Sequence, residues 1–235
     1  LFSGLKSLTG KTYIEKTILK AIKNNIAIYA IHTNLDSILS GVNYKIAQKL
    51  NIKQPKILAP IKDDLLKLET YIPKEKIKQV KKAIFNAGAG AIGNYDECAF
   101  ETSGKGSFRP LENSNPFIGE QNKTEFVDEN KIEIIFPKHL EKKIIDALKN
   151  NHPYEEVAYQ IISIKNTNQT IGAGMYGELE KPMKFKPFLE FVKKNMKTDC
   201  IRYTNTTKSI NNEEIKTIAF CGGSGSFLLN DAKKI

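Results

Sequence analysis

Residues 26–31 form an unbroken apolar run, Ile-Ala-Ile-Tyr-Ala-Ile, with polar residues at both ends. The run is short for a buried helix, so it predicts a strand buried on both faces, as in a parallel sheet covered by helices. His32 and Asp36 follow it, where the carboxyl end of the strand is expected to open into a loop. Ligands of open α/β sheets bind at that edge, which makes both side chains candidate site residues.

An imidazole close to a carboxylate suits a divalent metal, or a general base with the group that orients it. Both residues also have ordinary structural interpretations. His32 can be a hydrogen-bonded residue at a strand end, and Asp36 can cap the following helix. Two ligands are fewer than the three that a catalytic metal site usually takes from the protein.

Apolar side chains at helical spacing predict helices at residues 12–24, 44–50 and 183–196. Strands are predicted at residues 54–62, 201–203 and 217–221, and a polar, glycine-bearing crossing at residues 167–177. The strand at residues 217–221 runs into Gly222-Gly223-Ser224-Gly225-Ser226, and residues 227–229 open a helix. The amides of such a turn can bind an anion. The alternative is a tight turn at the sheet edge, because the spacing matches neither the dinucleotide fingerprint nor the P-loop.

The middle of the chain contains an internal repeat. Residues 71–74 read Tyr-Ile-Pro-Lys and residues 135–138 read Ile-Phe-Pro-Lys. Each copy continues into a helix with matched apolar positions, Val80 with Ile144, Ala83 with Ala147 and Ile84 with Leu148. Each helix then leads through a turn to a predicted strand, near residues 95–101 or 157–164. Two strand–helix–strand units in tandem predict a ferredoxin-like sandwich.

The stretch His32-Thr33-Asn34-Leu35-Asp36, followed by Gly41-Val42-Asn43, is one of several that carry a family resemblance. The others, in chain order, are residues 2–8, 88–95, 104–110, 115–119, 152–156 and 220–226. Together they resemble the NIF-three-like dinuclear metal hexamer family, whose members often carry the name GTP cyclohydrolase 1 type 2. The stretches follow the family's order along nearly all of the chain, so the match is more specific than any single motif.

This resemblance implies a three-layer α/β core, residues 1–67 and 166–235, interrupted by an inserted ferredoxin-like (PII/CutA-like) α+β domain at residues 68–165. It also implies a homohexamer and a site with two divalent ions, Zn, Mn or Fe, in the complete chain. Such ions activate a water and stabilise charge on a phosphate or carbonyl oxygen. The resemblance implies that Asp36 is a metal ligand. His32 lies beside the metals, as a ligand or as the catalytic residue that orients the ligand shell or moves a proton. The glycine turn, Gly222, Gly223, Ser224 and Gly225, lies near the same centre as a binding loop.

Two of the family's metal signatures are absent from the sequence. A His-His-Pro stretch is expected directly before Leu1, and a His followed by a Glu is expected after Ile235. No histidine lies beyond His152, so we expect the sequence to be truncated at both ends. These residues alone are therefore expected to bind metal weakly or not at all at Asp36, and the complete protein to bind about two ions per chain.

The formal net charge of +10 raises the possibility of nucleic-acid binding. Only Arg109 and Arg202 are arginines, and phosphate and base recognition favour the bidentate arginine fork. The lysines are spread along helix-like segments, so we interpret them mainly as surface charge. The three cysteines, Cys98, Cys200 and Cys221, are widely spaced and predict reduced thiols in a cytoplasm rather than a disulfide framework. We find no leader and no apolar run long enough for a membrane span.

Three other residues have both a structural and a functional interpretation. His152, in His-Pro-Tyr-Glu-Glu, can chelate a metal, but Pro153 favours a fixed turn. Arg109 can bind an anion or brace its loop, and His139 is expected to be solvated at a helix start. Our leading hypothesis is a metal-dependent hydrolase acting on a small molecule, with a nucleotide or phosphate ester as one possible substrate. The alternatives are a non-enzymatic metal-binding assembly or regulatory protein and, more weakly, a lysine-rich nucleic-acid binder.

Overall fold

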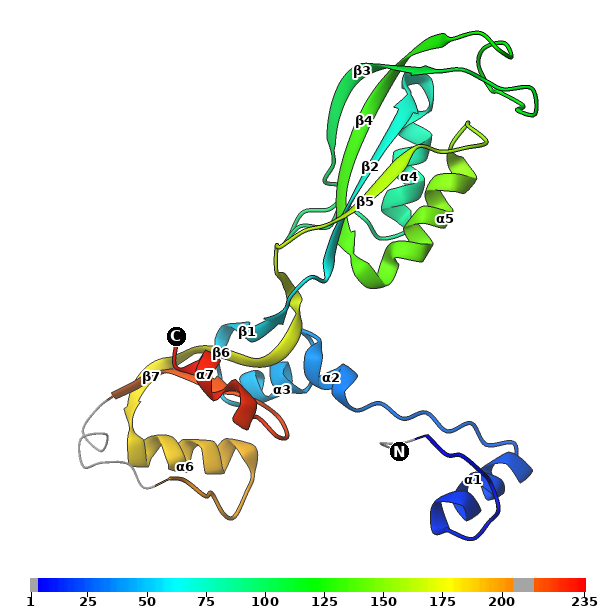
Figure 1. Ribbon diagram of the computed structural model, residues 1–235. Coiled ribbons are helices and arrows are strands. Elements are labelled where there is room, and N and C mark those ends of the chain that lie inside the picture. The colour runs from blue at the N-terminus through cyan, green and yellow to red at the C-terminus, as the bar shows by residue number, and fades with distance from the viewer. Residues whose placement is uncertain (1–3, 205–213) are drawn as a thin grey trace. The chain divides into compact units, whose positions relative to one another are not determined.

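The computed structural model describes residues 4–204 and 214–235 and divides the chain into two compact units (Figure 1). One unit consists of Leu1–Leu58 and Ala173–Ile235, and the other is the continuous segment Ala59–Gly172. Phe2 and Ser3, which begin one of the stretches with the family resemblance, lie outside the described residues. The chain as a whole is a mixed α/β protein.

The continuous unit holds a four-stranded sheet. Its main elements are β2 (Leu65–Pro73), α4 (Ile77–Asn86), β3 (Phe100–Phe108), β4 (Glu125–Pro137), α5 (Glu141–Asn151) and β5 (Tyr159–Ser163). A short 3-10 turn precedes each helix, Lys74–Lys76 before α4 and Lys138–Leu140 before α5. The strand order is β3-β4-β2-β5, and every neighbouring pair is antiparallel. Figure 1 shows α4 and α5 side by side on one face of this sheet.

The core of this unit lies between the sheet and its two helices. Val80 and Ile84 of α4 and Ile144 and Leu148 of α5 are completely buried, which confirms that the repeat pairs equivalent core positions. Alternate residues of β4, Ile132, Ile134 and Phe136, complete the core from the sheet. A strand presents every second side chain to one face, so the residues between them face away from the helices.

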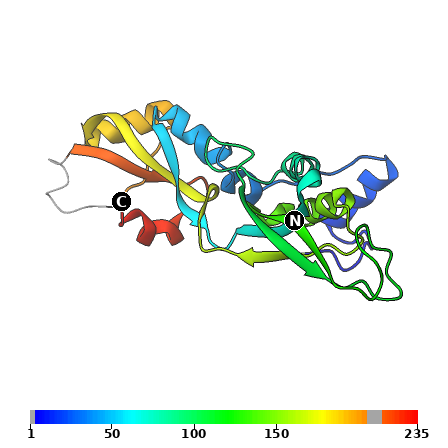
Figure 2. The same ribbon diagram turned by 90° about the horizontal axis from the view of Figure 1, so that it is seen from above.

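The discontinuous unit holds a three-stranded sheet in the order β1-β6-β7 (Figure 2). The strands are β1 (Lys53–Ile61), β6 (Asn168–Lys184) and β7 (Glu214–Phe220). The helices are α1 (Tyr13–Lys23), α2 (Thr33–Ser37), α3 (Val42–Lys49), α6 (Phe185–Met196) and α7 (Leu229–Ala232), the last preceded by the 3-10 turn Ser226–Leu228. β6 and β7 are antiparallel, with an irregularity between Glu178 and Met183.

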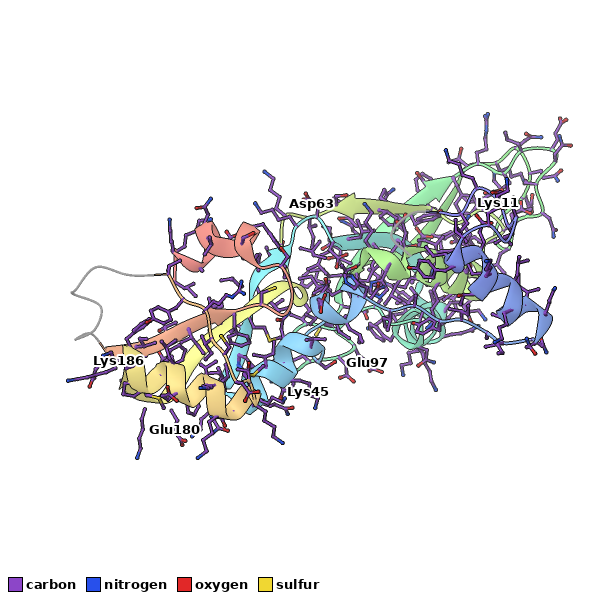
Figure 3. The ribbon with its side chains drawn as sticks, turned by 90° about the horizontal axis from the view of Figure 1, so that it is seen from below. Lys11, Lys45, Asp63, Glu97, Glu180 and Lys186 are labelled. Carbon is purple, nitrogen blue, oxygen red and sulfur yellow. The ribbon has the colours of Figure 1, made fainter. Side chains whose placement is uncertain are left out.

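The helices α3 and α6 share the core of this unit with the sheet. Ala47 and Leu50 of α3 cluster with Leu179 of β6 and Ile218 of β7, and apolar side chains of α6 pack against them. The charged residues Lys45 and Lys186, labelled in Figure 3, are exposed on the same two helices. This division between an apolar and a charged face is the pattern that the helical spacing in the sequence predicts.

The predicted buried strand at residues 26–31 is wrong. The run is irregular in the structure, and Ile26, Ile28 and Tyr29 are 60%, 60% and 85% exposed. Its first residue instead follows the end of α1, where the Ile26 N–H donates to the Ala21 carbonyl over 2.9 Å. An apolar run becomes a strand only where another strand accepts its backbone hydrogen bonds, and no described strand pairs with it.

Three further predictions differ from the structure. Residues 201–203 form no strand, and the crossing predicted at residues 167–177 is the first part of the long strand β6. The strand predicted near residues 95–101 begins only at Phe100. Polar and glycine residues can lie in a strand when neighbouring strands supply the hydrogen bonds, so pairing overrides local preference here. No helix in the described part of the chain is long and apolar enough to cross a membrane.

Candidate functional site

The candidate metal residues lie on a short helix and its first flanking residue. Asp36 is in α2 and is half-buried, and His32 is the exposed residue at the N-terminal end of that helix. They are therefore not at the carboxyl end of a strand, because the run before them is irregular. After α2 the chain turns sharply at Gly41, where an added Cβ would lie 1.8 Å from the Leu35 carbonyl oxygen. Only glycine fits that close approach, which lets α3 begin directly after the turn.

Asn43 connects this segment to the glycine turn at the other end of the sequence. Its side chain is 1% exposed. Its Nδ2 donates to the Asp36 carbonyl oxygen over 2.8 Å, and its Oδ1 accepts from the Gly222 N–H over 2.8 Å. One buried amide thereby fixes the backbone of Asp36 relative to that of Gly222. The sequence interpretation gave Asn43 no role, although it stands in one of the stretches that carry the resemblance.

The glycine turn follows β7, as the sequence predicts. Gly223 has a φ of +78°, in the left-handed region that favours glycine, and an added Cβ on Gly222 would lie 3.0 Å from Val42 Cγ1. The Gly222 N–H is already used by Asn43, so it does not point freely to an anion. The turn therefore has a clear structural role in joining β7 to α3. Its anion-binding role stays a prediction.

Cys221 lies at the same junction. Burial raises the pKa of its thiol, and the negative charge of Asp36 raises the pKa further. The thiol Sγ also donates to the Gly222 carbonyl over 3.3 Å. A protonated thiol is a weaker nucleophile and a weaker metal ligand than a thiolate, so this environment disfavours both functions for the unbound thiol.

The donors around Asp36 are too few for a two-ion centre. No group of three His, Cys, Asp or Glu side chains that could hold a metal ion occurs among the described residues. A typical catalytic metal takes three ligands from the protein, and a pair of ions takes more. The described residues thus fit, at most, one part of a dinuclear site.

His152 has a structural role in the continuous unit. Its Nε2 lies 2.9 Å from the Tyr71 carbonyl oxygen, and its Nδ1 accepts from the Tyr154 N–H over 3.2 Å. This pair of bonds requires a neutral ring with the proton on Nε2. Both nitrogens are engaged, so the structure favours the fixed turn over metal chelation. Arg109 and His139 are both exposed.

Comparisons with known proteins identify relatives of this chain. The family model described as Duf34/NIF3 (NGG1p interacting factor 3) matches residues 1–235. A Bacillus subtilis protein named GTP cyclohydrolase 1 type 2 homolog is 41% identical over 235 residues, which are 100% of this chain and 62% of that protein. A protein of the same name from Staphylococcus aureus strain COL is 34% identical over 225 residues, 96% of this chain and 60% of that protein.

A solved structure shows the same similarity. The Bacillus cereus protein related to NIF3 has a TM-score of 0.79 and 36% identity to this chain, covering 99% of this chain and 61% of its own. The chain thus spans about three fifths of the length of the relatives it matches. Because the family match extends over every residue, the chain belongs to the Duf34/NIF3 family.

Proposed function

We propose that this chain supplies one part of a hydrolytic centre, with the Asp36 carboxylate as a ligand to one of two divalent ions. The observation that carries the proposal is the Asn43 bridge, because a buried amide that joins Asp36 to Gly222 fixes the backbone from which the Asp36 carboxylate extends. The name of the relatives, GTP cyclohydrolase 1 type 2 homolog, agrees with a nucleotide or phosphate ester as substrate.

We propose that the remaining ligands of this centre come from residues beyond those described. A lone carboxylate leaves an ion largely hydrated and holds it weakly, and a two-ion site needs several protein ligands. Zn, Mn or Fe suits a mixed set of imidazole and carboxylate ligands. His32 is exposed beside α2 and is proposed to orient the ligands or to move a proton.

The proposal extends to the setting of the site. We propose a cytoplasmic homohexamer whose continuous unit, residues 59–172, is a ferredoxin-like domain inserted into the core. The order of its two helices and four strands supports that interpretation. Light scattering on a protein of the relatives' full length tests the assembly, and a stable monomer at high concentration contradicts it.

Elemental analysis of a protein of the relatives' full length that contains this sequence tests the centre. We expect about two ions per chain, and we expect Asp36→Asn to lose at least one ion together with most hydrolysis of GTP or a phosphate ester. The matched control is Asp231→Asn, which changes an exposed ion pair with Lys234 and is expected to keep both ions. Full metal content in Asp36→Asn overturns the ligand assignment.

A second candidate function is a non-enzymatic metal-binding assembly or regulatory protein. It rests on the same Asn43 bridge, which fixes the Asp36 backbone whether or not a bound ion takes part in a reaction. The same experiment separates the two classes, because this candidate predicts bound ions without hydrolysis of any phosphate ester tried.

A further inference from the structure

The continuous unit contains a cavity of about 560 Å³ that the proposed hydrolytic centre does not use. It is lined by most of β3, by residues of β2 and β4, by the connection between β3 and β4, and by the connection between α5 and β5. Figure 1 shows both connections at the same end of the sheet. Its volume falls within the range of small-molecule sites, which is about 300–1,000 Å³.

The lining comes from stretches that the sequence already singled out. Residues 104–110, 115–119 and 152–156 all carry the family resemblance, and each contributes side chains or backbone to this cavity. None of them belongs to the unit that holds Asp36 and the glycine turn. The fold therefore gathers three distant signature stretches around one space.

Aromatic rings form one side of the cavity. The ring centroids of Phe108 and Phe117 are 6.0 Å and 6.4 Å from the ring centroid of Tyr154, and both rings are tilted relative to the Tyr154 ring. Tyr154 is held in place by its N–H bond to the buried His152 ring. Such rings offer flat apolar contacts to a planar ligand. Gly104 and Gly106 add side-chain-free backbone, which lets a ligand come close.

A buried carboxylate belongs to the same cavity. Glu129 is only 8% exposed, and its Oε1 accepts a hydrogen bond from the Tyr154 hydroxyl over 2.8 Å. An added Cβ on Gly106 would lie 2.1 Å from Glu129 Oε2, so only glycine leaves room for this carboxylate. A carboxylate accepts several hydrogen bonds, and one removed from water needs donors or a cation to offset its desolvation.

No lysine near the cavity forms an ion pair with Glu129 among the described residues. Lys131 is held by Glu69 over 2.8 Å and by Glu133 over 2.9 Å, and no described ion pair includes Glu129. Lys105 is exposed, while Glu155 and Glu156 add carboxylates to the lining. Glu155 accepts a hydrogen bond from the Asn115 N–H, which joins the connection between β3 and β4 to the connection between α5 and β5. The cavity therefore combines an apolar, aromatic side with three carboxylates, those of Glu129, Glu155 and Glu156.

We propose that this cavity binds a planar aromatic compound whose edge presents two neighbouring N–H donors. The ring lies against Tyr154 and Phe117, and the N–H edge donates to the Glu129 carboxylate. The N–C–N edge of guanine and the amidine group of an aromatic amidine share this chemistry. The proposal stands independently of the metal centre, since its residues all lie in the other unit.

Calorimetric titration of the 235-residue chain tests the proposal with guanosine, inosine and benzamidine. Inosine lacks the exocyclic amine of guanosine and keeps the rest of its shape. A site built to hydrogen-bond a donor rejects an analogue without that donor. We expect guanosine to bind at least tenfold more tightly than inosine. Binding of benzamidine alone assigns the cavity to aromatic amidines rather than to a nucleobase. Equal affinity for guanosine and inosine with no benzamidine binding, or no binding by any of the three at millimolar concentration, overturns the proposal.

Variants identify the site. Glu129→Gln keeps an acceptor for Tyr154 and is expected to weaken the tighter ligand at least tenfold. Asp128→Asn is the matched control on the same strand, because Asp128 is exposed, lies outside the cavity lining and pairs with Lys74, and it is expected to leave affinity unchanged. Phe117 is 50% exposed, so Phe117→Ala preserves the core and decides the matter if Glu129→Gln does not fold. Unchanged affinity in Phe117→Ala, or an equal loss of affinity in the Asp128→Asn control, shows that the ligand does not bind in this cavity.

Discussion

Asn43 shows how one side chain can connect two ends of a chain. The amide bridges the backbone of Asp36 and Gly222, and it is almost completely buried. Nothing in the local sequence marks it as a bridge, because an asparagine after glycine and valine is typical of any turn or helix start. Its role becomes visible only when β7 and α3 lie against each other.

Replacement of Asn43 by alanine is expected to lower the free energy of unfolding by about 2–4 kcal/mol. Each buried backbone group left without its partner costs about 1–3 kcal/mol. Urea denaturation followed by circular dichroism measures the change. Asn195→Ala, which removes a side-chain bond to the Phe191 carbonyl on α6, is the control and is expected to change stability by less than about 0.5 kcal/mol. A change equally small in Asn43→Ala contradicts the bridging role.

His152 is expected to make the stability of the continuous unit pH-dependent. Burial lowers the pKa of its ring, and this effect exceeds the opposing effects of the Tyr71 carbonyl and the Glu129 charge. Between the lowered folded pKa and the unfolded value of about 6.5, the unfolded chain binds more protons. Stability is thus fully present above about pH 6.5 and falls as the pH drops through the folded pKa.

Urea denaturation at several pH values between 5 and 8 measures this dependence. His152→Gln is expected to be less stable at pH 8, because it loses the two ring hydrogen bonds, and to lose the step below about pH 6.5. His139→Gln changes an exposed histidine and is expected to keep the wild-type profile. A profile in which stability rises on acidification would falsify the assignment.

At the scale of elements, periodicity predicted most of the helices. The predicted helices at residues 12–24 and 183–196 agree with α1 and α6, and the repeat agrees with α4 and α5. Helical hydrogen bonds are local, so an apolar stripe of the right period is sufficient to locate the element. Strands were predicted less well, since 26–31 is irregular and 167–177 belongs to β6. A strand depends on a partner elsewhere in the chain, which local patterns do not specify.

Limited proteolysis tests whether the continuous unit is compact. Residues 62–63, before β2, and residues 166–167, after β5, are exposed, and no described strand pairs with the exposed apolar run 26–31. We expect early cuts at these places and a resistant fragment that contains residues 68–165, because cleavage needs accessible, irregular backbone. Mass spectrometry identifies the cuts. Cleavage within α4 at the same rate means that this unit is not compact.

At the scale of the whole molecule, the formal net charge of +10 comes almost entirely from lysines, which are spread along the chain, and not from arginines. Several lysines are also held in ion pairs, such as Lys67 and Lys131 with Glu69 and Glu133. These contacts lower the pKa of Glu69 to about 2 and raise the pKa of Lys131. A lysine that is paired within the sheet is less available to a phosphate backbone.

We therefore expect weak DNA binding with a shallow dependence on salt. A protein that contacts 6–10 phosphates loses about 10³–10⁵ in affinity between 50 and 200 mM salt. Fluorescence anisotropy with a labelled duplex is expected to show a loss of less than about tenfold over that range. A loss of 10³ or more would restore the nucleic-acid interpretation of the lysines.

The amino-acid sequence by itself determined the family, the main helices and the repeat of the continuous unit, because these depend on residue order and local spacing. Only the tertiary structure decided that the run 26–31 is exposed, that Asn43 joins Asp36 to Gly222, and that three signature stretches enclose one cavity with Glu129. Each of these facts is a contact, or a missing contact, between residues far apart in the chain. Such contacts are set by strand pairing and packing, which no local pattern contains.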